Sequence, residues 1–225
     1  MSDYTLEITA KLLCHTSLFK GISAGDMLRI LPSLRGRVYR VKPMEIYHSE
    51  GEKINRVGVV FTGNLLVCKI HKEGWVNLIE KLAPSYMISV DVACTPSRIN
   101  PYRVYSAEGA DVFDFAFDSI YKPGRIPEGT RLIILQNIML FLANQNIRKQ
   151  YKIDALCVNS LRERILTYLE TRSAKLGSDQ FEIPFNREEM ANYLCVNRSA
   201  LSHELSLMRG EGLIDFQKNH FRIIR

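Results

Sequence analysis

The feature that most constrains the fold is a short pattern near the C-terminus, Asn-Arg-Glu-Glu at residues 186–189. Asparagine followed three residues later by glutamate is a capping box, in which two side chains satisfy backbone donors at a helix start. From this box we predict a helix over residues 187–194. Residues 195–197, Cys-Val-Asn, then form a tight turn, and we expect Asn197 to cap a second helix from residue 198 to about 209.

The second predicted helix has two different faces. Leu201, Leu205 and Met208 repeat at i, i+4 and i+7, as expected for the face of a helix that packs on a core. The opposite face is short, polar and rich in hydrogen-bond donors, and it consists of Arg198, Ser199, Ser202, His203 and Ser206. Side chains of this kind can reach the base edges in the major groove of DNA.

The residues after this helix predict a β-hairpin, or wing. Gly212 ends the helix, and the apolar runs 213–216 and 221–224 flank residues 217–220. An ordinary pair of helices with a solvated polar face is the alternative, and it would be preferred if the two helices stood alone. Cap, turn, inner stripe and hairpin occur together at fixed spacing, which favours a DNA-binding winged helix-turn-helix. The residues expected to contact DNA are Arg198, Ser199, Ser202, His203, Asn197, Ser206 and Arg187.

The predicted module is not basic. Residues 178–225 contain six Lys and Arg against seven Asp and Glu, so non-specific attraction to phosphate should be modest. Helix N-termini and serine hydroxyls must then supply many of the phosphate contacts. The whole chain carries a formal charge of +6, and residues 141–175 hold seven Lys and Arg against three Asp and Glu. The positive excess therefore lies mainly before the module.

A long helix is predicted in the middle of the chain. Residues 130–176 contain neither Pro nor Gly, and Pro127 is a good helix start. An apolar stripe repeats at three- and four-residue steps, as in a coiled coil, and it consists of Leu132, Leu135, Met139 and Leu142. We predict a dimerisation helix over residues 128–153 and a homodimer. A single amphipathic helix that lies on the preceding domain is the alternative.

Residues 1–127 are strand-rich. Runs at 37–41, 57–61, 65–70 and 112–115 are apolar or alternating, and turn residues divide them. Many short strands with regular turns predict a sandwich or barrel. The fold class that follows is α+β.

Several classes of protein are not supported by the sequence. The five cysteines include no C-x-x-C pair, which argues against a disulfide framework or a zinc site and favours a reducing cytoplasm. No signal peptide is recognisable at the start, and no stretch approaches the roughly 18 apolar residues of a membrane span. We find no nucleophile–base pair or phosphate-cradling glycine loop, so we expect no enzyme activity and no metal site.

With these motifs the sequence resembles the Crp–Fnr superfamily of transcription regulators. Residues 186–194 and 197–205 are similar to the family's helix-turn-helix, and 211–214 to its helix-to-wing junction. Residues 18–23, with Ser23 as a helix cap, resemble the N-terminal start of the family's sequences, and residues 62–65 match a turn of its β-roll. The resemblance covers essentially the whole chain.

The resemblance implies an architecture and a set of partners. It implies a β-roll effector-sensing domain over residues 1–127, a dimerisation helix over 128–153 and a winged helix-turn-helix domain over 154–225. It also implies double-stranded DNA, a second copy of the chain, RNA polymerase and a small-molecule effector as partners, and a palindromic operator. Two departures bear on the operator sequence: the family usually has an acidic residue at the position of Ser199 and often Arg at that of His203.

The predicted sensor departs further from the family. The Gly-Glu and Arg-Ser pairs that hold the ribose and phosphate of a cyclic nucleotide fall on residues 89–90 and 100–101, Ser-Val and Asn-Pro. The carboxylate and the cation are gone, so we expect an effector other than cyclic AMP. The candidate effector-binding residues are Ser89, Val90, Asn100 and Tyr102. A sensor module that acts through protein partners without DNA is the alternative function.

No cofactor is expected. The iron–sulfur cysteine cluster of oxygen-sensing members of the family is absent. Haem ligation by Cys14 or His15 together with His71 is the remaining possibility for a cofactor, but lone cysteines and histidines are mostly structural.

Overall fold

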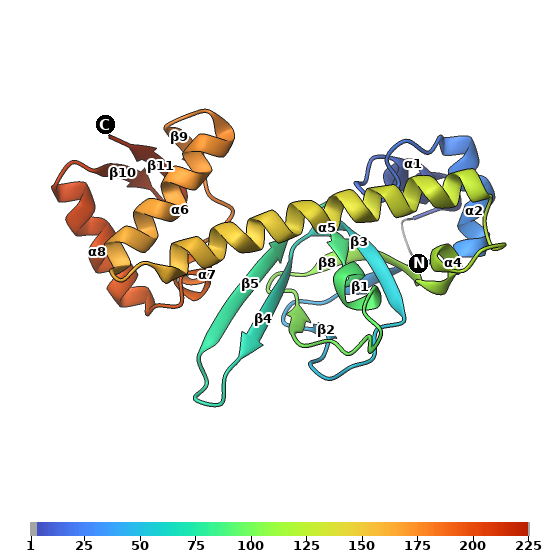
Figure 1. The fold of residues 1–225 in the computed structure, drawn as a ribbon, viewed down its shortest axis with the longest axis horizontal. Helices are drawn as coiled ribbons and strands as arrows, with labels where there is room; N and C mark the ends of the chain where they lie inside the picture. Colours follow the sequence, from blue (N-terminus) through green and yellow to red (C-terminus); the bar gives the residue numbers. More distant parts are fainter. Residues whose placement is uncertain (1–3, 225) are drawn as a thin grey trace. The chain divides into compact units, whose positions relative to one another are not determined.

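The computed structural model describes residues 4–224, which divide into two compact units (Figure 1). Unit 1 is Met1–Lys69 with Glu80–Asn144, and unit 2 is Ile70–Ile79 with Gln145–Arg225. The division falls within the long helix, whereas the sequence analysis drew its boundaries before residue 128 and after 153. Unit 2 also takes in a short hairpin segment that is remote in sequence from its other residues.

Unit 1 opens with helices α1 (Leu6–Cys14) and α2 (Ala24–Leu34), and the short helices α3 (Val90–Ala93) and α4 (Asp118–Tyr121) follow later in the chain. The start of α2 was predicted from its cap. The Ser23 hydroxyl accepts a hydrogen bond from the backbone N–H of Asp26 at 3.1 Å, which satisfies a donor that the helix leaves free.

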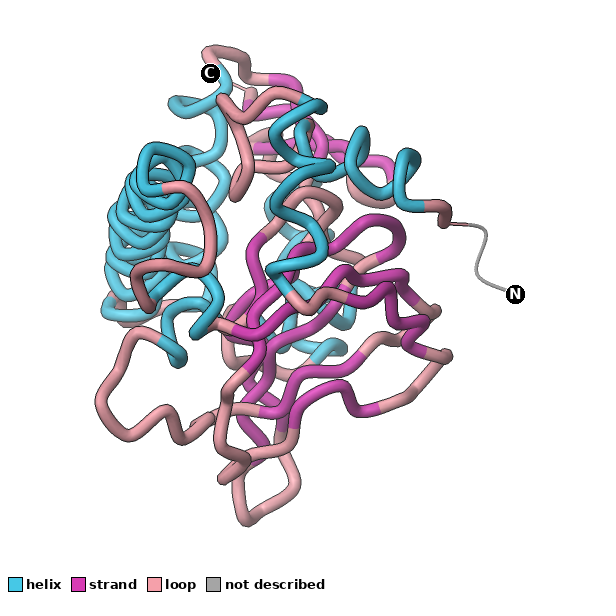
Figure 2. Tube along the Cα trace, turned by 90° about the vertical axis from the view of Figure 1, so that its right-hand side faces the viewer, coloured by secondary structure: helices cyan, strands magenta, loops and turns pink. Residues whose placement is uncertain are grey.

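The strands that precede the long helix form two four-stranded sheets, which Figure 2 draws in magenta. The first sheet contains, in spatial order, β1 (Arg37–Val41), β8 (Ala110–Ala116), β3 (Arg56–Gly63) and β6 (Met87–Ile88). The second contains β2 (Ile46–His48), β7 (Arg103–Tyr105), β4 (Leu65–Ile70) and β5 (Val76–Leu82). Strand β8 pairs antiparallel with both β1 and β3. The predicted β-rich first part of an α+β fold is confirmed.

The sequence analysis found four of these strands and missed four. The predicted runs 37–41 and 65–70 coincide with β1 and β4, and 57–61 and 112–115 lie within β3 and β8. Strands β2, β6 and β7 have three residues or fewer, too short to show an alternating pattern. Strand β5 reads Val-Asn-Leu-Ile-Glu-Lys-Leu, in which polar residues interrupt the alternation.

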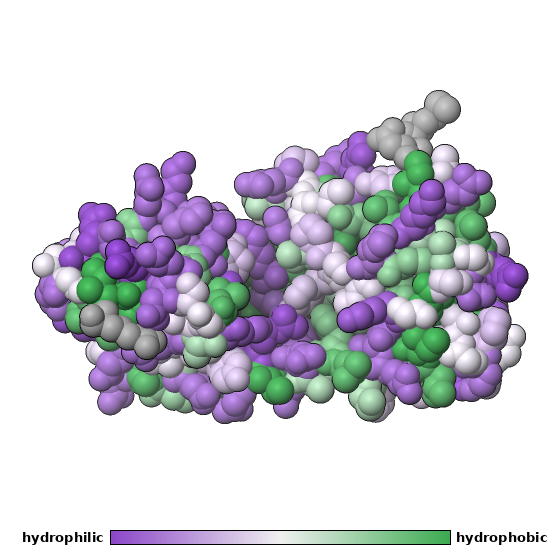
Figure 3. Space-filling view, turned by 90° about the horizontal axis from the view of Figure 1, so that it is seen from above, coloured by the Kyte–Doolittle hydropathy of each residue, from purple (hydrophilic) through white to green (hydrophobic). Residues whose placement is uncertain are grey.

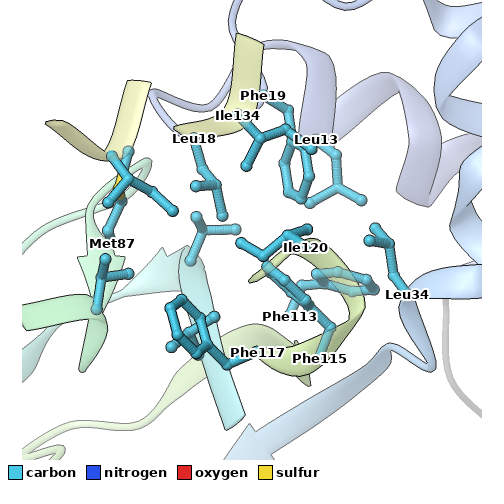
Figure 4. Close-up of a cluster of buried hydrophobic side chains, with 14 of the residues drawn as sticks. Leu13, Leu18, Phe19, Leu34, Met87, Phe113, Phe115, Phe117, Ile120 and Ile134 are labelled. Atoms are coloured by element: carbon cyan, nitrogen blue, oxygen red, sulfur yellow. The ribbon is translucent and has the colours of Figure 1, made fainter. Parts of the chain in front are cut away.

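The core of unit 1 joins the helices to the first sheet. Its largest side chains are aromatic and aliphatic, and Figure 4 shows them gathered around Phe113, Phe115 and Phe117. They come from α1, α2, the segment between these two helices, β6, and β8 with the residues that follow it. Ile134 and Ile138 of the long helix are buried in the same core. Each buried side chain of this kind stabilises the fold by about 1.5–3 kcal/mol relative to exposure.

The long helix α5 runs from Glu128 to Cys157, four residues beyond the predicted end at 153. It has two apolar faces, one buried and one exposed. Ile134 and Ile138 face the core, and Leu142 packs against that core as well, although it was predicted on the stripe facing a partner. Leu132 and Met139 stay exposed, at 54% and 62% of their surface.

Unit 2 contains the predicted C-terminal module. Its elements are α6 (Leu161–Leu176), β9 (Gln180–Glu182), α7 (Arg187–Tyr193), α8 (Arg198–Gly210), β10 (Ile214–Gln217) and β11 (His220–Ile223), with the strands in the order β10-β11-β9. A helix break separates α5 from α6 without Pro or Gly. It is set by a capping box, in which Ser160 accepts from Glu163 N–H and the Glu163 side chain accepts from Ser160 N–H.

Within unit 2, Lys152 of α5 binds the hairpin segment 70–79. The ammonium of Lys152 donates to the carbonyl oxygen of Leu78 at 2.6 Å and to Oδ1 of Asn77 at 3.1 Å. The same nitrogen lies 4.4 Å from the ring centre of Tyr193 on α7. Among residues 4–224, no helix is long and apolar enough to cross a membrane.

Candidate nucleic-acid interface

Helix α7 begins at the capping box that the sequence predicted. The side chain of Asn186 accepts from the Glu189 N–H at 2.9 Å, and the Glu189 carboxylate accepts from the Asn186 N–H at 2.9 Å. Both orphan donors are thus satisfied. Met190, Ala191 and Leu194 are buried, so these side chains fix α7 to its unit.

The turn between α7 and α8 differs from the prediction in one respect. Asn197 has the extended backbone of a cap residue, but its side chain makes no capping hydrogen bond. The prediction that Asn197 caps α8 through its side chain is therefore wrong. The first backbone N–H groups of α8 are left without a side-chain acceptor, and such groups bind phosphate well. Cys195 lies in the left-handed region at φ +56°, a conformation that favours glycine.

Helix α8 presents the two predicted faces. Leu201, Leu205 and Met208 are fully buried, which fixes the rotation of the helix about its axis. The predicted outer residues Arg198, Ser199, His203 and Ser206 are exposed, as is Asn197, while Ser202 is half-buried. The Ser206 hydroxyl donates to the Ser202 carbonyl at 2.9 Å. One polar, cation-bearing face is therefore available along α8.

Arg198 has an acidic neighbour that the sequence analysis did not single out. Its Nη1 atom lies 3.7 Å from Oε2 of Glu188, the second residue of α7. The capping box uses Glu189, not Glu188, so the Glu188 carboxylate faces the start of α8 with no role in capping. Sequence spacing could not reveal this pair, because it forms across the turn between two helices.

Arg187 lies in a different environment from the other predicted DNA-contacting residues. Its guanidinium carbon is 5.0 Å from the ring centre of Phe216 and 5.8 Å from that of Phe221, both on the wing. Its Nη2 atom donates to the Lys218 carbonyl at 3.3 Å. Burial lowers the pKa of Arg187, and the positive charge of Arg198 lowers it further.

A second arginine fixes the far end of α8. Arg162 on α6 donates from Nε to Glu204 at 2.7 Å and from Nη1 and Nη2 to Glu211 at 2.6 and 2.8 Å. These acids hold the pKa of Arg162 above its usual value, Glu211 contributing most. The paired contacts with Glu211 use the planar fork of the guanidinium. The charges of Arg162, Glu204 and Glu211 therefore hold α6 against α8.

Positive charge gathers on the helices before the module, as the composition indicated. Burial lowers the pKa of Lys175 on α6, and the neighbouring charges of Arg148 and Arg172 lower it further. These three cations come from two helices of the same unit. They are a source of attraction for polyanions that lies outside α8.

The four candidate effector residues have mixed surroundings. Val90 is buried in the core of unit 1, and Asn100 is 2% exposed. The Asn100 amide donates to the carbonyls of Ser49 and Tyr102 at 2.8 and 2.6 Å, and its Oδ1 accepts from the Tyr102 N–H at 3.3 Å. Ser89 precedes α3 and makes no side-chain capping bond. The side chain of Val90 is thus packed in the core, and the side chain of Asn100 is engaged in hydrogen bonds to two backbone carbonyls.

One open cavity lies in unit 2. This cavity of about 620 Å³ is formed on the three-stranded sheet of unit 2 by residues of all its strands, among them Gln180, Asp215 and His220. None of the candidate effector residues lines it. All five cysteines are free, and residues 4–224 contain no group of three or more His, Cys, Asp or Glu that could hold a metal ion.

Comparisons with known proteins agree with this geometry. Residues 163–225 match the protein family described as the Crp-like helix-turn-helix domain. No curated protein sequence matches the chain. Among solved structures, the chain is similar to FixK2 from Bradyrhizobium japonicum, at 16% identity over 84% of this chain and 92% of that one, with a TM-score of 0.65.

Two further structures have the same fold. The c-di-GMP responsive global regulator CLP from Xanthomonas campestris has a TM-score of 0.70 at 13% identity, over 90% of this chain and 100% of its own. A putative transcriptional regulator of the crp/fnr family from Eubacterium rectale has a TM-score of 0.61 at 16% identity, over 92% of this chain and 93% of its own. At these identities the likeness establishes the fold.

Residues 163–225 therefore match a Crp-like helix-turn-helix domain, and the chain shares its fold with solved regulators. That fold is the one seen in a solved regulator of the crp/fnr family, with which the C-terminal match agrees. The resemblance that the sequence indicated is confirmed.

Proposed function

We propose that the protein binds a palindromic DNA operator as a homodimer and that a small molecule other than cyclic AMP controls it. The exposed polar face of α8 carries this proposal, because its buried opposite face leaves Arg198, Ser199 and His203 free to enter a major groove. The free cysteines fit a reducing cytoplasm as the place of action.

Dimerisation is proposed through α5. Apolar side chains stay exposed along this helix and recur at seven-residue steps, at positions 132 and 139 and at 140 and 147. The surface seen from above carries apolar patches, in green, between polar residues in purple (Figure 3). A second copy of α5 could cover the exposed apolar side chains of this helix, as in a coiled coil. Of the predicted stripe, Leu132 and Met139 are exposed, Leu135 is half-buried, and Leu142 packs on the core. The proposed interface keeps Leu132, Leu135 and Met139 and adds the exposed Leu140, Ile147 and Tyr151.

Two α8 helices related by a twofold axis would enter successive major grooves, about 34 Å apart. Arg198 stands at the start of α8, and its planar fork suits O6 and N7 of guanine. Ser199, Ser202, His203 and Ser206 follow along the same helix, and Asn197 and the free backbone N–H groups beside it suit phosphate. The residues proposed to read bases are therefore Arg198, Ser199, Ser202 and His203.

The proposed effector is not a cyclic nucleotide. Val90 and Asn100 stand at the positions where the family resemblance places the carboxylate and the cation, and both side chains are buried and engaged in packing or loop hydrogen bonds. Ser89 and Tyr102 remain candidates to touch an effector. We propose that RNA polymerase contacts the regulator when the regulator is bound to DNA. We propose no enzymatic activity.

A binding selection on random duplex DNA tests the proposed function. The full-length protein should enrich one palindrome with half-site centres about one helical turn apart. Enrichment of no sequence, with binding at all duplexes equally weak, would contradict operator reading. A sensor module that acts through protein partners alone would give that result.

A further inference from the structure

One aromatic ring of the wing lies beside two arginines from the two helices of the DNA-binding motif. The guanidinium carbon of Arg187 is 5.0 Å from the centre of the Phe216 ring, and that of Arg209 is 4.7 Å away. Both distances fall in the range of cation–π contacts. Arg187 is the first residue of α7 and Arg209 lies in the last turn of α8. Phe216 therefore ties both helices to strand β10.

The contact extends to the tip of the wing. Phe216 stacks on Phe221 of β11, with ring centres 5.5 Å apart and planes inclined by 25°. Arg187 lies 5.8 Å from that second ring, and it donates a hydrogen bond to the carbonyl of Lys218 in the turn. Lys218 is held at φ +55°, so its backbone has a restricted conformation. The arginine that touches the strands thus also fixes the turn.

We propose that Arg187 and Arg209 are positioning residues that set the wing relative to α8, so that Lys218 at its tip contacts a DNA phosphate. This inference rests on the proposed DNA binding and deepens it. Lys218 is exposed, and its backbone carbonyl, not its ammonium, is the group that Arg187 holds. An exposed ammonium on a fixed turn is suited to bind a phosphate of the DNA backbone beside the groove that α8 enters.

The surroundings of Arg187 distinguish positioning from direct contact with DNA. Its guanidinium is half-buried against two rings and a carbonyl, whereas Arg198 is 67% exposed. Lysine cannot replace it in this setting, because an ammonium lacks the planar face that lies on an aromatic ring and the fork that donates in two directions. Arg187→Lys therefore keeps the positive charge but removes the positioning.

A double-mutant cycle on the full-length protein and its selected operator tests the proposal. In the wild type, Lys218→Ala should reduce the slope of log affinity against log salt by about 0.9 per half-site. In the Arg187→Lys background the same change should have a much smaller effect, so that the two substitutions couple by about fivefold or more in affinity. Phe216→Leu, which keeps an apolar side chain, should uncouple Lys218 in the same way.

Two controls make the outcome decisive. Lys175→Ala removes an exposed lysine of α6 and should act additively with Arg187→Lys. Circular dichroism melting of each variant checks that it is folded at the assay temperature, and Phe216→Leu replaces Arg187→Lys if the latter is not. Additivity of Lys218→Ala with both Arg187→Lys and Phe216→Leu would overturn the inference. A wild type that binds no duplex would contradict the proposed function instead.

Discussion

The Nη1 atom of Arg198 lies 3.7 Å from the carboxylate of Glu188, and both side chains are 67% exposed. An exposed pair of this kind contributes little to stability, about 0–1 kcal/mol. The pair affects DNA binding more than stability, because the Glu188 carboxylate beside the start of α8 repels phosphate. We infer that Glu188 keeps Arg198 from serving as an unspecific phosphate contact.

Glu188→Gln should therefore strengthen binding to all DNA and weaken discrimination. We expect the affinity for random duplex DNA to rise about fivefold and the ratio of operator to random affinity to fall, measured by fluorescence anisotropy at two salt concentrations. Glu170→Gln on α6 is the matched control, since it removes the same charge from an exposed helix position. Equal effects of the two substitutions would show that only net charge matters.

The dimer depends on the apolar stripe of α5. Met139→Glu places a charge in the middle of the proposed interface and should raise the dimer dissociation constant at least a hundredfold, since a desolvated carboxylate without a partner costs several kcal/mol. Sedimentation equilibrium at micromolar concentration measures this change. Leu28→Glu, on the exposed face of α2, makes the same kind of change outside the stripe and should leave the dimer intact. A wild type that sediments as a folded monomer would contradict the assignment.

Asp111 predicts a pH dependence of stability in unit 1. Arg40 donates two hydrogen bonds to this carboxylate and Tyr4 donates a third, and these contacts lower the pKa of Asp111. A lowered pKa in the folded state means that the carboxylate stabilises the protein above the pKa of the unfolded chain, about 3.9, and that this contribution is lost as the pH falls through the folded value.

Asp111→Asn should thus lower the free energy of unfolding at pH 5 and have a smaller effect near pH 3. Urea denaturation at both pH values measures the difference, and Glu108→Gln, an exposed carboxyl of the same unit, serves as the control. An effect of Asp111→Asn that is the same at both pH values would show that the hydrogen bonds do not depend on the charge.

Cyclic AMP and cyclic GMP should not bind with useful affinity. The phosphate would find Asn100, whose amide is already committed to two carbonyls, and the ribose would find the buried side chain of Val90. Losing a charge-assisted partner costs roughly 1.5–3 kcal/mol, about a tenfold or greater loss of affinity for each group. Calorimetric titration measures this binding, and a micromolar dissociation constant for either nucleotide would contradict the prediction.

Local signals explain which parts of the fold the sequence could predict. The capping boxes at Asn186 and Ser160 and the stripe of Leu201, Leu205 and Met208 are formed by neighbours in the chain, so spacing alone locates the helices. The helix break at Ser160 was not predicted, because the span without Pro and Gly continues through its capping box. Strand β5 was not predicted because its polar residues Asn77, Glu80 and Lys81 follow no alternating order.

The features of the site that the sequence did not predict arise between remote residues. Phe216 lies beside Arg187 only because the wing folds back on α7, and Arg162 meets Glu204 and Glu211 only because α6 packs against α8. Arg187 was predicted to contact DNA because it lies at the start of a helix. Its contacts with two aromatic rings come from tertiary packing, which residue spacing does not encode.

The assignment of base reading to α8 is tested most directly by selection on random DNA with the wild type and Arg198→Ala. A base-reading arginine predicts that the wild type enriches a palindrome and that the variant loses preference at one position in each half-site, with a cost of about 1–3 kcal/mol per half-site. Arg198 acting only on phosphate predicts weaker binding to all sequences and a smaller salt slope. An Arg198→Ala protein that enriches the same motif as the wild type would contradict the account.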